Sequence, residues 1–393
     1  MSEAATPVAL ERCVSVRSGK TPSRNRAEFW SGPIPWFSAK DLKSFELSDS
    51  EEHISAAALD DGAPVASPGE ILVLVRGMTL MKDVPIGVLR REASFNQDIK
   101  CLRPVDGVRS GYLGYMLAAS RPRLLSMVDQ AGHGTGRLAL ERLMSLPIWR
   151  PSERHQEFVE DSLRSIDWHL STLDRLIEAK RTFKCGLMQQ LLTGRKRFPE
   201  FKGSPWVMHW FDHLCEELSE RNGSSLGPDC VMGVIKGVGF EPMRQRVRGK
   251  GDLARYKIVP PNAFAYNPMR LNIGSIAFNN SGKTILVSPD YEVFRARDGV
   301  ADPEYVNQLR YSRYWTSFMD RAGAGSVRVR IYFTDLARLR VPAPNVDEQC
   351  RIAEALRLAD LEIDQLAQLH ELIEAQRRAL LSRLLSGSLV VPS

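Results

Sequence analysis

Two long stretches of the chain carry leucine and isoleucine at steps of three and four residues, the spacing of a helix that packs against another helix. They run over 151–194 and 344–387. Each opens with proline and a polar residue and ends in glycine, which is typical of helix boundaries. A helix over 152–194 would be roughly 60 Å long, too long for one small domain to bury. The pattern therefore predicts two long helices, each with a helical partner. The predicted helix–helix seam consists of Leu163, Ile166, Leu170, Leu173, Ile177, Leu356, Ile363, Leu366, Ile373 and Leu380.

The two stretches are copies of one unit. Pro344 lies 193 residues after Pro151, and this shift aligns them without a gap, with identical residues at Gln156 and Gln349 and at several leucines. A repeat of nearly half the chain length predicts two similar halves, each a globular part followed by a long helix. The predicted boundaries are 1–150 and 197–343 for the globular parts and 151–196 and 344–387 for the helices.

The globular parts combine short β-prone segments with helical ones. GEILVLVRG, WFSAKDL and RYKIVPPNAFAYNPMRLNIGSIAF are apolar, bounded by Gly, Pro or Asp, and typical of strands, whereas GYLGYMLAASRPRLLSMV has helical periodicity. Each half ends with a glycine-rich turn and a basic segment before its helix, so that Leu140 corresponds to Phe333. We expect mixed α/β domains with small, largely antiparallel sheets.

Polar residues interrupt both predicted seams: Lys180 and Lys184 in the first, His370 and Arg377 in the second. Buried polar residues in a seam can fix its register at some cost in stability. The alternative is that the two helices separate at these positions. The sequence leaves both interpretations open.

Composition indicates a folded protein that functions without a membrane. The 393 residues carry a net charge of +6, and no apolar run approaches the roughly 18 residues that span a bilayer. The first residues lack the pattern of a signal peptide, so we expect a cytoplasmic protein. Six scattered cysteines without a CxxC pair predict free thiols rather than a disulfide framework or a zinc site.

Motifs of catalysis are missing. The SGKT strings at 18–21 and 281–284 lack the preceding glycine of a phosphate-binding loop, since Val14 and Ala277 stand there. Asn267-Pro268 lacks the Pro-aromatic pair of amino-methyltransferases, and the sequence contains no HExxH or GxSxG. The chain is therefore predicted to have no active site of its own.

Basic residues gather instead in glycine-bounded loops. Phosphate binding needs Lys, Arg and free backbone N–H groups, and base recognition needs Arg, Lys, Asn or Gln held on rigid turns. Each residue by itself could be an ordinary surface cation or turn residue, but the set favours contact with DNA. The predicted DNA-binding residues are Lys20, Arg76, Lys82, Arg137, Arg246, Arg248, Lys250, Tyr266, Arg270, Asn272, Arg328 and Arg330.

Several motifs resemble one family. They are VRSGKTP at 16–22, IPWFSAKDL at 34–42, PGEILV at 68–73, FNQDI at 95–99, YNPMRLNIGSIA at 266–277 and VPAPNVDEQCRIAEAL at 341–356. The last contains P-x-x-x-E-Q-x-x-I before a long helix, the most specific of these motifs. In the first copy His155-Gln156 replaces the Glu-Gln pair, a change that we do not expect to disturb the helix. Over essentially its whole length the chain resembles the specificity subunits of type I restriction-modification systems.

This resemblance implies an α+β fold with two pseudo-repeated α/β target recognition domains, separated by two long antiparallel helices that form a coiled-coil spacer. It implies that each domain recognises one half of an asymmetric, bipartite site in double-stranded DNA. It further implies two methyltransferase subunits, which bind S-adenosylmethionine, and up to two restriction subunits, which use ATP and Mg²⁺, while this chain holds no cofactor or metal. The alternatives are a coiled-coil scaffold or adaptor with two protein-binding domains and an enzyme, such as a nuclease, with an unrecognised site.

Overall fold

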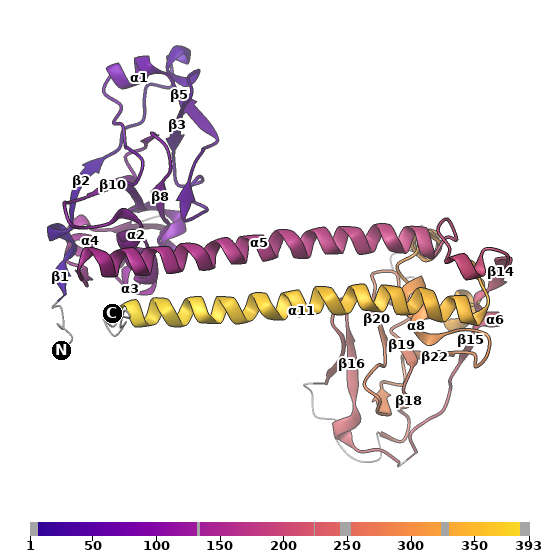
Figure 1. Ribbon diagram of the computed structural model, residues 1–393. Helices are drawn as coiled ribbons and strands as arrows, with labels where there is room; N and C mark the ends of the chain where they lie inside the picture. Colours follow the sequence, from indigo (N-terminus) through magenta and orange to yellow (C-terminus); the bar gives the residue numbers. More distant parts are fainter. Residues whose placement is uncertain (1–6, 132–133, 224, 244–252, 324–329, 386–393) are drawn as a thin grey trace. The chain divides into compact units, whose positions relative to one another are not determined.

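The computed structural model describes residues 7–131, 134–223, 225–243, 253–323 and 330–385 and divides into two compact units. Unit 1 comprises Met1–Asp174 and Gln368–Ser393, and unit 2 comprises Arg175–Ala367. The two predicted long helices are present as α5, Glu153–Leu191, and α11, Val346–Leu385 (Figure 1). Each unit therefore contains one globular part and a segment of both helices.

Unit 1 is built on a five-stranded sheet in the order β2-β10-β6-β8-β4. Neighbouring strands in this sheet are antiparallel, except for β4 and β8, which are parallel. The helix α2, Ser110–Ala119, packs on this sheet, and Val159 and Leu163 of α5 and Leu384 of α11 belong to the same apolar core. The strands are β2 (Val14–Ser18), β10 (Ile99–Pro104), β6 (Ile71–Leu74), β8 (Ile86–Leu89) and β4 (Glu46–Leu47).

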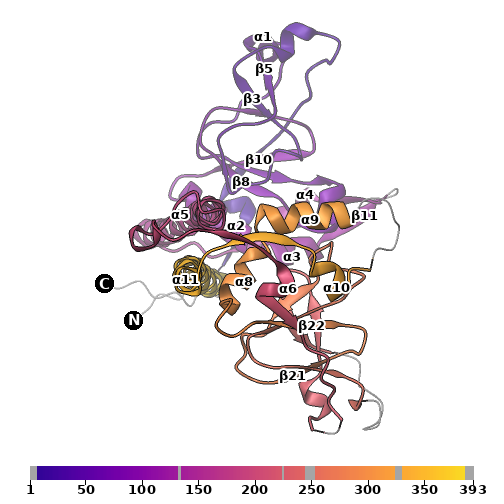
Figure 2. The same ribbon diagram turned by 90° about the vertical axis from the view of Figure 1, so that its right-hand side faces the viewer.

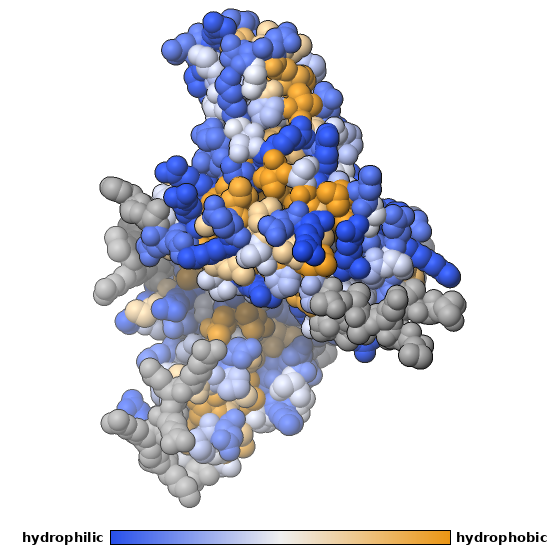
Figure 3. All heavy atoms as spheres, turned by 90° about the vertical axis from the view of Figure 1, so that its left-hand side faces the viewer, coloured by the Kyte–Doolittle hydropathy of each residue, from blue (hydrophilic) through white to orange (hydrophobic). Residues whose placement is uncertain are grey.

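A small lobe, which we call lobe 1 and define as residues 20–63, leaves the sheet after β2. Phe29, Trp36, Ile54, Ala58 and Ala63 form an apolar cluster of its own. Within unit 1 it lies on the far side of the sheet from α5 (Figure 1, Figure 2). Its surface is mostly hydrophilic in the view of Figure 3, with hydrophobic residues gathered on one side. Its elements are η2 (Ala27–Trp30), β3 (Ile34–Phe37), β5 (Glu52–Ile54) and α1 (Ala56–Asp60), and β9 (Ser94–Phe95) pairs with β3.

The rest of unit 1 leads from the sheet to α5. The predicted helix over GYLGYMLAASRPRLLSMV is two helices, because Pro122 cannot continue α2 and instead starts α3. The remaining elements are β1 (Val8–Ala9), η1 (Leu10–Arg12), β7 (Arg76–Gly77), η3 (Met78–Met81), α3 (Arg121–Ser126), β11 (Val128–Ala131), β12 (Thr135–Leu138), α4 (Leu140–Met144) and β13 (Pro147–Ile148).

Unit 2 contains a four-stranded antiparallel sheet in the order β15-β22-β19-β20. The unit also contains the antiparallel hairpin β16–β17 and the antiparallel pair β18–β21, of which β18 lies farther from α11 than the sheet does (Figure 1). The strands are β14 (Val207–Trp210), β15 (Cys215–Glu217), β16 (Met232–Ile235), β17 (Gly239–Pro242), β18 (Lys257–Val259), β19 (Ala263–Tyr266), β20 (Ile276–Phe278), β21 (Ile285–Val287), β22 (Glu292–Ala296) and β23 (Arg340–Ala343). The helices are η5 (Pro199–Phe201), α6 (Phe211–Leu214), η6 (Pro228–Cys230), α8 (Pro303–Leu309), α9 (Arg313–Gly323) and α10 (Phe333–Leu336).

The globular parts repeat the same framework at the same shift as the helices. Four elements of unit 1 have a counterpart in unit 2 about 193 residues later in the chain. The pairs are β6 with β19, β10 with β22, α2 with α8, and α4 with α10. Gly69 and Asn262, which precede β6 and β19, share a positive φ (86° and 62°). Asparagine is among the few residues other than glycine that tolerate this conformation. The duplication predicted from the helices therefore extends through both domains.

The repeated glutamine anchors each long helix to its own domain. Gln156 is fully buried; its side-chain oxygen accepts from Arg109 N at 2.9 Å, and its nitrogen donates to the carbonyls of Gly107 (3.0 Å) and Pro151 (2.9 Å). Gln349 makes the equivalent three bonds in unit 2, to Asp302 N, Val300 O and Pro344 O, at 3.0, 3.2 and 2.9 Å. The glutamine of the repeat is thus a buried connector.

The residue before this glutamine differs between the units. Asn345 accepts from Glu348 N at 3.0 Å, which is one half of a capping box. The Glu348 carboxylate turns instead to the Arg197 guanidinium (2.9 and 2.6 Å) and to Trp206 Nε1 (3.2 Å). In unit 1 the equivalent His155 packs edge-on against Trp149, and burial lowers its pKa. Both helices form, as we expected from the sequence.

The helices run antiparallel within each unit. In unit 1, Asp167 pairs with Arg377 at 2.5 Å and Asp174 with His370 at 3.3 Å. In unit 2, Lys184 pairs with Asp360 at 2.5 Å and Lys180 with Glu362 at 2.6 Å. Every polar seam residue therefore has an acidic partner on the other helix, which favours a fixed register over separation.

The predicted apolar seam lies on the inward side of the helices. Leu163 of unit 1 and Ile177, Leu356 and Ile363 of unit 2 are buried. The others are half-buried: Ile166, Leu170, Leu173, Leu366, Ile373 and Leu380.

Candidate nucleic-acid interface

Two of the arginines predicted to contact DNA lie directly opposite each other in unit 1. Arg76 of β7 is the register partner of Arg137 of β12 in the antiparallel sheet β11-β12-β7. Side chains at such positions point to the same face, about 5 Å apart at Cβ, and like charges there are destabilising. Both side chains are exposed, and among the described residues neither has a hydrogen bond or an ion pair. Asp129 is in register with Arg137 on its other side, but its carboxylate pairs with Arg142 at 2.8 Å, so the two arginines keep free donors for a bound anion.

Lys82, the third predicted residue of this region, lies on another side of β12, because the helix η3 before it packs on the face to which Gly136 points, and Arg137 points to the opposite face. It follows η3, which lies against β12. Gly136 allows this contact, because a Cβ there would come within 2.7 Å of the Leu80 Cβ. Lys82 is exposed, and no partner for it lies within the described parts of the chain. We call Arg76 and Arg137 the basic patch of unit 1.

Unit 2 repeats the backbone geometry of this patch. Leu138 N donates to Val75 O at 2.9 Å, and Ile331 N donates to Pro268 O at 3.0 Å. Each residue of the second bond lies 193 positions after its counterpart in the first. The loop after β19 is therefore joined to the segment before α10 as β7 is joined to β12.

Two predicted arginines stand on this repeated geometry. Arg330 occupies the place of Arg137, and Arg270 stands one residue beyond the place of Arg76. Both are exposed. The Arg330 guanidinium donates to Tyr332 Oη at 3.3 Å, and Arg270 has no side-chain partner among the residues that the structure covers. Each unit thus presents two arginines that lack an acidic partner within the described chain.

The prediction that Tyr266 contacts DNA is wrong. Tyr266 has no exposed surface, because AFAY forms the central strand β19, all of whose residues are buried. Its ring lies edge-on to Phe294, its hydroxyl has no hydrogen-bond partner within the described residues, and burial raises its pKa. It is a core residue of unit 2.

The other predicted residues fall in different places. Asn272 is exposed beside a cavity of about 730 Å³, which the tip of the β16–β17 hairpin and α9 also line. Lys20 lies in lobe 1, where its Nζ donates to Asp61 O at 2.5 Å and lies 3.6 Å from the Asp61 carboxylate. Four residues, Arg246, Arg248, Lys250 and Arg328, lie outside the described residues.

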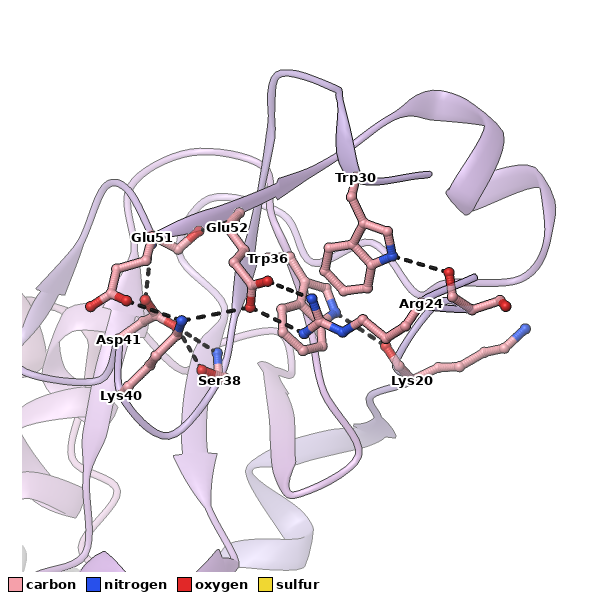
Figure 4. Close-up of polar contacts among 11 residues, drawn as sticks. Lys20, Arg24, Trp30, Trp36, Ser38, Lys40, Asp41, Glu51 and Glu52 are labelled. Atoms are coloured by element: carbon pink, nitrogen blue, oxygen red, sulfur yellow. Dashed lines mark hydrogen bonds and ion pairs between the residues drawn. The ribbon is translucent and has the colours of Figure 1, made fainter. Parts of the chain in front are cut away.

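Lobe 1 contains a charged aromatic cluster that the predictions missed (Figure 4). The Arg24 guanidinium lies 3.6 Å from the Trp30 ring centroid and donates to both Glu52 carboxylate oxygens at 2.5 and 3.1 Å. Lys40 approaches Glu52 from another side at 3.6 Å. The hydrogen bond from Arg24 lowers the pKa of the Glu52 carboxyl. The run RNRAEFW marked this region as basic and aromatic, but Glu52, distant in sequence, was not expected there.

Sites for other chemistry are not apparent in the described residues. They contain no group of three His, Cys, Asp or Glu that could hold a metal ion. The six cysteines are free, as predicted. No helix in the described portion is long and apolar enough to cross a membrane.

Two curated proteins are similar to this chain in sequence. The Type I restriction enzyme EcoR124I/EcoR124II specificity subunit of Escherichia coli is 28% identical over 151 residues, which cover 38% of this chain and 37% of that protein. The Type I restriction enzyme MjaIX specificity subunit of Methanocaldococcus jannaschii is 32% identical over 174 residues, 42% of this chain and 37% of that protein. The chain thus spans little more than a third of the length of these relatives. No protein-family model matches it.

Solved structures extend the likeness to nearly the whole chain. The type I restriction-modification S subunit from M. genitalium matches with a TM-score of 0.60 at 12% identity, over 98% of this chain and 97% of that one. The HsdS subunit from Thermoanaerobacter tengcongensis matches with a TM-score of 0.53 at 14% identity, over 99% and 98%. At these identities the likeness concerns the fold, and it confirms the predicted α+β class with its two α/β domains and two long helices. In sequence over part of its length and in fold over nearly all of it, the chain resembles the specificity subunits of type I restriction-modification systems.

Proposed function

We propose that this chain is the DNA sequence-recognition subunit of a type I restriction-modification complex. It binds an asymmetric, bipartite site in double-stranded DNA, one half-site for each unit. It also holds the subunits that modify and cleave the DNA. The relatives are named as specificity subunits of type I restriction enzymes, which supports a place in such an assembly.

The repeated arginines are the observation that carries this proposal. Arg137 and Arg330 are exposed at equivalent positions of the two units; Arg76 lies opposite Arg137, and Arg270 is exposed one residue beyond the place of Arg76 in unit 2. Like charges placed together without an acidic partner are offset by phosphate groups, which dominate the affinity of proteins for duplex DNA. A duplicated patch suits a ligand that presents phosphates to both units.

Exposed leucines on α11 support the docking of partner proteins. Leu358 and Leu361 in unit 2 and Leu369 and Leu372 in unit 1 are between 43% and 58% exposed. Their spacing places them on one face of the helix. We assign this face to two methyltransferase subunits, one for each unit, and expect up to two restriction subunits to join them.

In this proposal the chemistry belongs to the partners. The methyltransferase subunits bind S-adenosylmethionine, the restriction subunits use ATP and Mg²⁺, and this chain binds no cofactor and catalyses no reaction. The complex acts in the cytoplasm, where it meets double-stranded DNA.

The test is the salt dependence of duplex binding by the full chain with its methyltransferase subunits. Affinity should fall steeply with salt, and the double variant Arg76→Gln/Arg137→Gln should flatten the log–log slope by roughly 0.9 for each lost phosphate contact. Like the single variant Arg137→Gln, Arg123→Gln removes one positive charge, but from an exposed position on α3, and it should leave the slope unchanged. Duplex binding that is absent or insensitive to salt would reject the proposal in favour of a coiled-coil adaptor.

A further inference from the structure

The two units share their basic patches but differ in the segments inserted before the central strand. In unit 1 the chain between β2 and β6 forms lobe 1, with the helix α1 and the strands β3 and β5, and also contributes β4 to the main sheet. In unit 2 the chain between β15 and β19 contains the β16–β17 hairpin and β18 instead. The insertions occupy the same place in the topology, since β2 and β15 are both edge strands beside β10 and β22.

The shared patches and the different insertions suit two separate roles, binding of the phosphate backbone and recognition of the base sequence. A contact repeated in both units, such as Arg137 and Arg330, gives both half-sites the same interaction and suits the phosphate backbone, which carries no direct sequence information. Two unlike half-sites need structures that differ between the units. Within the described residues, the inserted segments differ between the units in their helices and strands.

In lobe 1 the Arg24 side chain is held in a fixed orientation that suits base recognition. Arg24 is held on one face by the Trp30 indole and at its end by the two Glu52 oxygens (Figure 4). Trp30 is fixed in turn, because its Nε1 donates to Ser23 O at 3.1 Å and its ring stands edge-on to Trp36 at 5.0 Å. The Arg24 side chain remains 53% exposed. An arginine has five N–H donors, so the pair with Glu52 leaves donors free for the acceptors of a base edge.

We propose that Arg24 is a specificity-determining residue of unit 1 and reads a base pair, while the basic patches bind the phosphate backbone in both units. This inference rests on the proposed function. Arg24 is paired with a carboxylate and adds little net charge, so its contribution is to discrimination between sequences. Arg137 and Arg330 have no acidic partner in the described chain and contribute to affinity for any duplex.

The variant Arg24→Lys tests this assignment because it keeps the charge and removes the planar fork. In the complex with methyltransferase subunits, methylome sequencing first defines the wild-type target. Arg24→Lys should then relax preference at one base pair of one half-site by roughly ten- to hundredfold, with an unchanged salt slope. Arg137→Gln should do the reverse, weakening binding to all duplexes and flattening the slope. Arg26→Lys is the matched control, since Arg26 is similarly exposed, at 57%, but lies 3.7 Å from a single acidic partner, Asp61.

Two further measurements separate the outcomes. Near-ultraviolet circular dichroism of the lobe tryptophans verifies that each variant is folded, and hydrogen exchange at 23–30 in the wild-type complex should slow when target DNA binds. A folded Arg24→Lys variant with unaltered sequence preference overturns the inference, as does unchanged exchange in lobe 1. Wild-type complex that does not bind duplex DNA overturns the proposed function itself.

Discussion

The buried glutamine at the start of each long helix allows a sharp test of how the domains are attached. Replacing Gln156 with leucine keeps the side-chain size but removes one acceptor and two donors. It leaves Arg109 N–H and the carbonyls of Gly107 and Pro151 without their partner. An unsatisfied buried polar group costs about 1–3 kcal/mol, so three groups at the low end amount to about 3 kcal/mol.

The loss should be local. Hydrogen exchange detected by mass spectrometry gives the free energy of opening for individual segments, and Gln156→Leu should lower it by about 3 kcal/mol in α2 and at the start of α5. Gln349→Leu should have the matching effect on α8 and the start of α11. Gln365→Leu, an exposed position on α11, is the control. A loss below about 1 kcal/mol, or equal losses in both units from Gln156→Leu, would refute the anchoring role.

Three further predictions concern the helix pair and lobe 1. Asp167→Asn removes the charged partner of Arg377 and weakens the hydrogen bond from Tyr115 Oη. The free energy of opening of these helix segments, measured by hydrogen exchange, should fall by about 1–2 kcal/mol. If the effects of Asp167→Asn and Arg377→Met were fully additive in the double variant, the two residues would not be directly coupled. The Glu52 carboxyl should titrate below its ordinary pKa of 4.5 because Arg24 donates a hydrogen bond to it. The stabilisation of the folded state by this pair is therefore present above pH 4.5 and is lost as the pH falls through the lowered pKa. An ordinary pKa for this carboxyl in a carbon NMR titration would exclude the pair in solution. Inserting one helical turn in both α5 and α11 adds about 5 Å. It should lengthen the unread gap in the methylated site by one to two base pairs, and an unchanged gap would show that the helices do not set it.

The helices and the duplication could be predicted because their signals are local or repeated. Regular leucine spacing marks each helix, and identical residues at one shift reveal the copy without knowledge of the fold. The same shift continues through the sheets, where few identical residues remain, since the backbone framework tolerates different apolar side chains. Gly69 and Asn262 illustrate this: different residues satisfy one backbone requirement.

The candidate site was less accessible to sequence analysis. Tyr266 was misassigned because a strand with every residue buried shows no alternation between polar and apolar positions. The pairing of Arg76 with Arg137 depends on strand register, and the contact of Arg24 with Glu52 joins segments 28 residues apart. Such contacts follow from the path of the chain rather than from any local pattern.

The division of α11 between the units has a consequence for synthesis. Unit 1 needs residues from both ends of the described chain, because Leu384 of α11 is buried in the core that β6 and α2 form. Domains usually fold as they emerge from the ribosome, beginning with the N-terminal one. Here the apolar side of the first half of α5 must wait until α11 has been made, whereas unit 2, Arg175–Ala367, is continuous in sequence. The domain synthesised first is therefore the one completed last, and the nascent chain must keep the uncovered stripe at Leu163 and Ile166 from associating with other chains during that interval.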